Sequence, residues 1–110
     1  MSTSKRKKNS EHVGALAFLK KLSGGPLSFG DALRAVRERE GLTQVALAER
    51  MGVGRQTVCD LEHGRRLPSP GHAAKYARAL LHHEGQFVRL ALQDHVSRAG
   101  LKLKVKVEAA

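Results

Sequence analysis

Residues 42–64 (LTQVALAERMGVGRQTVCDLEHG) contain two short segments with the apolar periodicity of a helix, separated by a Met-Gly-Val-Gly turn. The first segment spans residues 44–51 and the second spans about residues 54–63. Glycine adopts a positive φ without steric cost, so Gly52 can reverse the chain sharply between the two. Two short helices joined by such a turn form a helix-turn-helix unit. This spacing constrains the fold more than any other feature of the chain.

Further helices are predicted around this unit by apolar periodicity and by stop signals. We expect them over residues 11–22, 28–40 and 85–98, with another that begins after Ser69. The apolar side of the helix after Ser69 is predicted to comprise Ala73, Ala74, Ala77, Leu80 and Leu81. Aromatic residues make up only 4% of the chain, so its core must consist mainly of Leu, Val and Ala. This composition favours packed helices over a β-sandwich.

The pattern changes to a period of two after Gly100. Leu101, Leu103, Val105 and Val107 alternate with charged residues, which predicts a short C-terminal β-strand. A lone strand leaves its backbone groups without partners, so we expect it to pair with a second copy or another protein. A frayed tail is the alternative.

The helix over residues 85–98 has a second apolar stripe beside its core face. Such a helix either contacts a second copy or is buried more deeply in its own domain, and both alternatives stay open. If it contacts a second copy, the predicted dimer interface comprises Val88, Leu92, Val96, Leu101, Leu103, Val105 and Val107.

The chain has a formal net charge of +10 and a pI of about 10.5. Such a charge fits a polyanionic partner, which includes DNA, RNA, an anionic membrane and an acidic protein. Cys59 is the single cysteine, so no disulfide can form within the chain, as suits a reducing cytoplasm. No apolar run is long enough to span a membrane, and no clear signal-peptide cleavage site follows the basic N-terminus. The six histidines lack metal-ligand spacing, and we expect no metal, no cofactor and no enzyme activity.

Polar side chains with base-reading chemistry open the second helix of the unit. Arg55, Gln56 and Thr57 occupy its first turn, and Asp60 lies one turn later. An arginine can bind guanine O6 and N7 with two hydrogen bonds, and a glutamine can do the same with adenine N6 and N7. The N-terminal residues of the second helix contact base edges when that helix lies in the major groove. We therefore predict base contacts from these four residues.

The sequence resembles the Xre family of helix-turn-helix proteins, the Cro and phage-repressor type. The matching residues are Leu33, Arg37, Gly41, Leu42, Thr43-Gln44, Leu47-Ala48, Gly52-Val53, Thr57-Val58 and Leu61-Glu62-His63-Gly64. The resemblance implies an all-α, five-helix repressor-like domain over about residues 28–98. It does not account for residues 1–26 or the terminal strand.

The resemblance also implies roles for the matching positions. Thr43 and Gln44, at a helix N-terminus, would contact a DNA phosphate, and so would Arg65 and Arg66 after the second helix. Arg37 and Glu62 match positions that form a structural ion pair. Gly54 departs from the family, because many members carry Ser or Thr there as the N-cap. Asp60 would be repelled by phosphate, so we expect it to face a base amino group or a neighbouring arginine.

The predicted organisation is a disordered basic tail (1–10), an N-terminal helix and linker (11–26), a DNA-binding domain (27–99) and a C-terminal strand segment (100–110). We expect a dimeric, sequence-specific regulator of double-stranded DNA, acting as a repressor by occlusion. It would be cytoplasmic and nucleoid-associated, of bacterial or phage origin. The alternative is an antitoxin similar to the HigA type, which neutralises a small toxin protein and regulates its own operon. RNA binding is a weaker alternative, because exposed aromatic residues are few.

Overall fold

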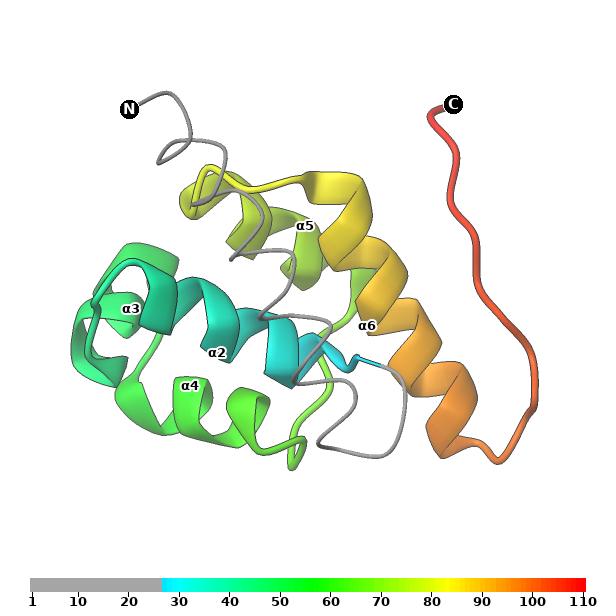
Figure 1. Cartoon of the computed structure of the whole chain (residues 1–110), viewed down its shortest axis with the longest axis horizontal. Helices are drawn as coiled ribbons and strands as arrows, with labels where there is room; N and C mark the ends of the chain where they lie inside the picture. The colour runs from blue at the N-terminus through cyan, green and yellow to red at the C-terminus, as the bar shows by residue number, and fades with distance from the viewer. Residues whose placement is uncertain (1–26) are drawn as a thin grey trace, which may run out of the picture.

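The computed structural model describes residues 27–110. This part of the chain is all-helical, as predicted, and contains five helices (Figure 1). They are α2 (Phe29–Arg39), α3 (Gln44–Met51), α4 (Arg55–Glu62), α5 (Pro70–Ala79) and α6 (Glu84–Arg98). The basic tail (1–10) and the predicted helix over residues 11–22 lie outside the described residues.

Short polar side chains fix where the helices begin. Ser28 caps α2 in a capping box: its Oγ accepts from the Asp31 N–H at 3.1 Å, and Asp31 Oδ2 accepts from the Ser28 N–H at 3.2 Å. Ser69 Oγ accepts from the His72 N–H at 3.1 Å at the start of α5, where Pro70 occupies the first turn. These caps explain why the predicted and observed helix starts agree closely.

The core lies where the five helices meet, and α2 runs through the centre of the view in Figure 1. Phe29 of α2 and Phe87 of α6 pack edge to face, with ring centroids 5.3 Å apart, and each is 1% exposed. The remaining buried side chains are mostly Leu, Ala and Val. Leu47, Ala48, Met51, Val58 and Leu61 are all buried, so the helix-turn-helix unit contributes directly to this core.

Gly30 lets α2 approach α4 closely. A Cβ atom at this position would lie 2.4 Å from the Leu61 carbonyl oxygen and 2.8 Å from the Glu62 carbonyl oxygen. These are backbone atoms, which cannot move aside as a flexible side chain would. The glycine therefore sets the spacing between α2 and the C-terminal end of α4.

Asp94 of α6 accepts a hydrogen bond from the Phe29 N–H at 2.9 Å and so joins α6 to the first turn of α2. Burial raises the pKa of Asp94, and the Phe29 hydrogen bond opposes that rise. Because the pKa is higher in the folded than in the unfolded state, the folded state binds more protons between the two values. The contribution of Asp94 to the free energy of unfolding therefore decreases as pH rises through the pKa of the folded state.

We predict that Asp94→Asn keeps the Phe29 hydrogen bond through the amide oxygen while removing the half-buried charge. Relative to the parent, the variant should gain stability between about pH 3 and pH 7, and the difference should be largest at neutral pH. Urea denaturation across this range measures it. The prediction would be contradicted if the variant had a lower free energy of unfolding than the parent and this difference grew toward neutral pH.

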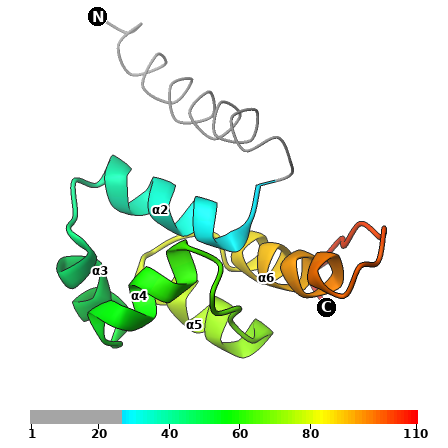
Figure 2. The ribbon, with the colours of Figure 1, turned by 90° about the horizontal axis from the view of Figure 1, so that it is seen from below.

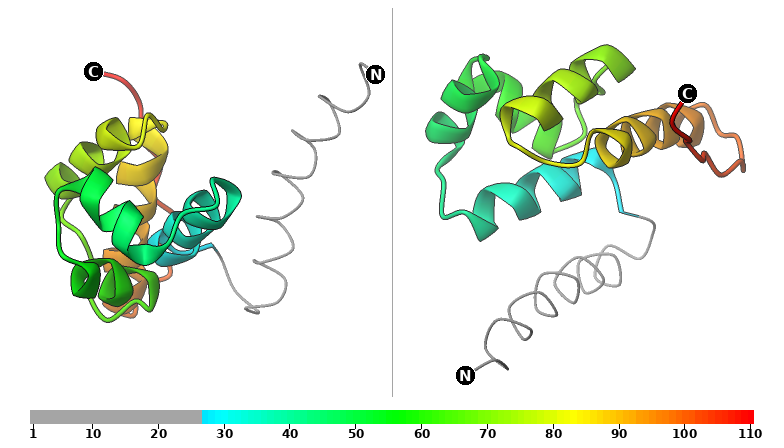
Figure 3. Two further views of the ribbon diagram at one scale, coloured as in Figure 1. Left: turned by 90° about the vertical axis from the view of Figure 1, so that its left-hand side faces the viewer. Right: turned by 90° about the horizontal axis from the view of Figure 1, so that it is seen from above.

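The predicted C-terminal β-strand is wrong. Of residues 27–110, none forms a strand, and residues 101–110 run as an extended segment beside α6 (Figures 1 and 3). The alternating pattern does give an extended chain, but no second extended segment lies next to it in the described residues. Instead the side chain of Gln93 bonds the backbone of Leu103 and Val105.

Leu81 was also assigned wrongly to the apolar side of the helix after Ser69. Helix α5 ends at Ala79, and Leu81 adopts a φ of 55° with its side chain 95% exposed. Ala73, Ala77 and Leu80 are buried as expected. A periodic pattern cannot show that a helix stops two residues before the last leucine of that pattern.

Candidate nucleic-acid interface

Helices α3 and α4 form the helix-turn-helix unit, and they are joined by a tight turn at Gly52 (Figure 2). Gly52 adopts a φ of 72°, which is a left-handed conformation that favours glycine. The Val53 N–H bonds the Ala48 carbonyl at 3.0 Å and closes the end of α3. Gly54 is the N-cap of α4 and makes no side-chain cap bond, as expected from its departure from the family pattern.

The predicted base-contacting residues gather on the outer side of α4. Arg55 and Gln56 are exposed, and Thr57 and Asp60 are half-buried. Gln56 Nε2 donates to Asp60 Oδ1 at 3.0 Å, and Arg66 NH1 lies 3.4 Å from Thr57 Oγ1. The structure therefore brings the base-contact and phosphate-contact residues predicted from the sequence into one surface.

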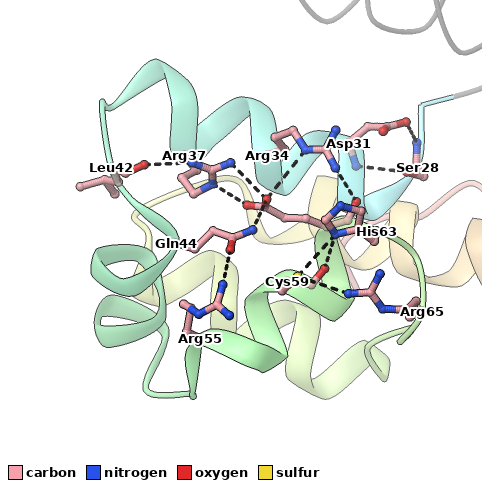
Figure 4. Close-up of polar contacts among 11 residues, drawn as sticks. Ser28, Asp31, Arg34, Arg37, Leu42, Gln44, Arg55, Cys59, His63 and Arg65 are labelled. Atoms are coloured by element: carbon pink, nitrogen blue, oxygen red, sulfur yellow. Dashed lines mark hydrogen bonds and ion pairs between the residues drawn. The ribbon is translucent and has the colours of Figure 1, made fainter.

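A buried carboxylate lies beneath this surface. Glu62, the last residue of α4, is 4% exposed. Arg37 of α2 binds it with two hydrogen bonds, from Nε to Oε2 at 2.6 Å and from NH2 to Oε1 at 3.2 Å (Figure 4). The hydrogen bond to Glu62 raises the pKa of Arg37 against the opposing effect of burial. The ion pair implied by the resemblance is thus present, and it joins α2 to the end of α4.

Arg34 is a second cation beside Glu62 that the sequence reasoning missed. Its Nε lies 3.8 Å from Glu62 Oε1, and its NH2 donates to the Glu62 carbonyl at 3.2 Å. The sequence did contain a signal for this contact. Arg34 and Arg37 are three residues apart, and residues i and i+3 share a helix face. Together the two arginines hold the side chain and the carbonyl of Glu62.

Gln44 connects this buried network to the recognition surface. Its Nε2 donates to Glu62 Oε1 at 3.1 Å, and its Oε1 accepts from Arg55 NH1 at 3.0 Å (Figure 4). The resemblance implied a phosphate contact for Gln44. In the free chain, its carbonyl oxygen and one amide hydrogen instead bond within the protein. Its neighbour Thr43 accepts from the Ala46 N–H at 3.1 Å and caps α3.

Asp60 holds two predicted DNA-contacting side chains in place. It accepts from Gln56 Nε2 and from Arg65 Nε, both at 3.0 Å. The hydrogen bond from Gln56 and then that from Arg65 lower the pKa of Asp60. The carboxylate therefore stays ionised at neutral pH and faces a neighbouring arginine, which was one of the two alternatives expected for it.

The loop after α4 carries the exposed Arg65 and Arg66, and α6 anchors both of its ends. Arg98 donates to the Gly64 carbonyl, and His95 Nε2 lies 3.1 Å from the Pro68 carbonyl oxygen. The sequence reasoning missed both anchors, because they lie about thirty residues away along the chain. They restrain the loop without using the side chains of Arg65 and Arg66.

Residues 27–110 contain no cluster of His, Cys, Asp and Glu that could hold a metal ion. No helix among them is both long and apolar enough to cross a membrane.

The geometry is that of a helix-turn-helix unit with a polar, basic outer surface. A family model described as Helix-turn-helix (HTH_3) matches residues 33–80. An uncharacterized HTH-type transcriptional regulator of Methanothermobacter thermautotrophicus is 54% identical over 48 residues, which are 44% of this chain and 70% of that protein. The HTH-type transcriptional repressor RghR of Bacillus subtilis is 36% identical over 84 residues, which are 73% of this chain and 62% of the repressor. No solved structure gives a significant match.

The chain therefore belongs to the helix-turn-helix family of DNA-binding transcriptional regulators.

Proposed function

We propose that this chain is a sequence-specific repressor that binds operator DNA as a dimer through α4. The observation that carries the proposal is the arrangement of α4, whose first turn exposes Arg55 and Gln56 beside the two arginines of the following loop. Base-reading and phosphate-binding chemistry thus share one surface. The similarity to a transcriptional repressor supports repression over activation.

In this proposal, α4 lies in the major groove and its first residues meet base edges. Arg55 offers two donors that suit guanine O6 and N7, and Gln56 offers one donor and one acceptor that suit adenine N7 and N6. Arg65 and Arg66 contact phosphates, which sets position without carrying sequence information. Asp60 acts as a positioning residue that orients Gln56 and Arg65 before DNA arrives.

A dimer follows from the small reach of one recognition helix. Two copies that bind half-sites about 34 Å apart read twice the sequence and gain specificity. The α6 stripe formed by Val88, Leu92 and Val96 supports this assembly, because each of these side chains is only half-buried in the single chain. Repression follows by occlusion where the operator overlaps a promoter.

We predict that Gln56→Ala weakens binding to the preferred DNA sequence by about 1–3 kcal/mol and relaxes base preference at one position. The side chain supplies hydrogen bonds to a base, so its loss affects one base pair more than the others. Fluorescence anisotropy with operator duplexes substituted at each position measures this. Gln86→Ala, on α6, is the matched control and should leave the preference unchanged. An equal loss of affinity on every duplex would remove Gln56 from base recognition.

We predict that Arg66→Ala lowers affinity evenly across DNA sequences and reduces the slope of log K against log salt by about 1. Each phosphate contact releases about one counterion on binding, so losing one contact lowers the magnitude of the slope by about 1. Binding measured over a series of salt concentrations gives the slope. Arg78→Ala is the control, because Arg78 is an exposed residue of α5, on the opposite side of the molecule from α4 (Figure 1). A slope unchanged in Arg66→Ala would exclude the phosphate contact.

The antitoxin alternative has weaker support. Neither relative reported above is named as an antitoxin. The predicted strand that would have joined a toxin's sheet is not formed in the described chain. We therefore propose a transcriptional regulator. A site for a protein partner, away from α4, is argued below.

A further inference from the structure

A groove of about 660 Å³ lies between α6 and the extended segment that follows it. Arg89, Leu90 and Gln93 of α6 line one wall, and residues 101–106 line the other. Leu27 also contributes to the lining. The groove lies on the side of the molecule away from α3 and α4, so it is separate from the proposed DNA surface (Figures 1 and 2).

Gln93 fixes the extended segment in place. Its Nε2 donates to the Leu103 carbonyl at 2.9 Å, and its Oε1 accepts from the Val105 N–H at 2.8 Å. The Leu101 N–H also bonds the Val96 carbonyl at 3.2 Å, at the point where the segment leaves α6. One amide side chain thus satisfies two backbone groups, and the groove exists before any partner binds.

The lining combines two kinds of chemistry. Leu101 is 53% exposed and Leu103 is 62% exposed, so both offer apolar surface that the chain itself does not cover. Arg89, Lys102, Lys104 and Lys106 line the same groove, and its lining contains no acidic residue. A well-matched occupant therefore carries apolar side chains together with carboxylates.

Other occupants match this surface less well. A second copy of the groove would place lysines against lysines, in a chain whose net charge is already +10. Nucleic acid would satisfy the lysines but would leave Leu101 and Leu103 without apolar contacts. A membrane surface is flat, whereas the basic and apolar groups here line a concave groove.

We propose that this groove binds a short segment of a partner protein in which acidic and apolar residues are interspersed. The lysines attract the carboxylates, and the leucines bury the apolar side chains. Gln93 holds the segment that forms the outer wall. This interaction is independent of DNA recognition by α4, so either one can fail without the other.

The test selects peptides from a phage-displayed library of random 12-residue sequences on the full chain. Labelled forms of the selected peptides are then titrated with each variant and followed by fluorescence anisotropy. The groove variant is Lys102→Glu/Lys104→Glu/Lys106→Glu. Its matched control, Arg39→Glu/Lys75→Glu/Arg78→Glu, makes the same change in net charge at exposed positions outside the groove.

We expect the selected peptides to combine Asp or Glu with Leu, Ile, Val or Phe. The parent and the control should bind them within about twofold of each other, and the groove variant should bind at least about tenfold more weakly. Leu101→Ser/Leu103→Ser should also bind more weakly, although its charge is unchanged. Circular dichroism checks that each variant folds.

Three results would overturn the proposal. One is the absence of enriched peptides, and another is equal binding by the groove variant and its charge-matched control. The third combines two observations: the parent binds no peptide, and the groove variant binds phosphatidylserine vesicles or DNA more weakly than the parent does. That last result would assign the lysines to a lipid or nucleic-acid surface.

Discussion

Replacing Arg37 by methionine is expected to lower the free energy of unfolding by about 3–5 kcal/mol. Methionine keeps much of the aliphatic volume but leaves the Glu62 carboxylate, 4% exposed, without both hydrogen bonds from Arg37, one of which is the shortest it accepts. Arg34 and Gln44 remain in contact with Glu62 but cannot replace a bidentate arginine. The Leu42 carbonyl also loses its bond from Arg37 NH1. Urea denaturation of the two proteins measures the difference.

Arg50→Met is the matched control for this prediction. Arg50 makes an ion pair with Glu40 at 2.8 Å, but its side chain is 50% exposed, so we expect a loss of about 0–1 kcal/mol. Equal losses in the two variants would mean that Arg37 contributes only as a surface charge. That outcome would contradict a structural role for the network beneath α4.

Replacing Gly30 by alanine is expected to lower the free energy of unfolding by at least about 2 kcal/mol. The new Cβ would lie 2.4 Å from the Leu61 carbonyl oxygen, so α2 and α4 would have to separate. Alanine has the better intrinsic helix propensity, by about 1 kcal/mol, and this gain works against the loss. Because α4 would move, DNA affinity should also fall in the folded variant.

Gly71→Ala tests the same chemical change without the close approach. Gly71 lies in the first turn of α5, and a Cβ there would meet nothing within 4 Å. We expect this variant to be as stable as the parent or more stable by up to about 1 kcal/mol. If Gly30→Ala behaved in the same way, the packing of α2 on α4 would be looser than the structure indicates.

Much of the fold was predictable from local chemistry. Ser28, Thr43 and Ser69 mark helix starts, and Gly52 marks the turn, because caps and positive-φ glycines act within a few residues. The close approach of α2 and α4 at Gly30 was not predicted, because an isolated glycine in a helical pattern does not show what packs against it. The C-terminal strand was not predictable in this way, because a strand needs a partner and an alternating pattern shows only one side of a pair.

The sequence predicted which residues belong to the site better than it predicted which of them contact one another. The family resemblance placed Arg37 and Glu62 together, and the chemistry of base recognition selected Arg55 and Gln56. The link from Glu62 through Gln44 to Arg55 depends on the relative placement of α2, α3 and α4. Likewise, the anchoring of the 64–68 loop by α6 depends on tertiary packing, which no local pattern encodes.

The most direct test of the central proposal is selection of binding sites from random double-stranded DNA by the full chain. The proposal predicts enrichment of one motif with two inverted half-sites, centred about 10 base pairs apart. Gln56→Ala should change the preferred base at one position within each half-site. A failure to enrich any motif over the starting library would contradict sequence-specific recognition through α4, and a single unpaired half-site would contradict the dimer.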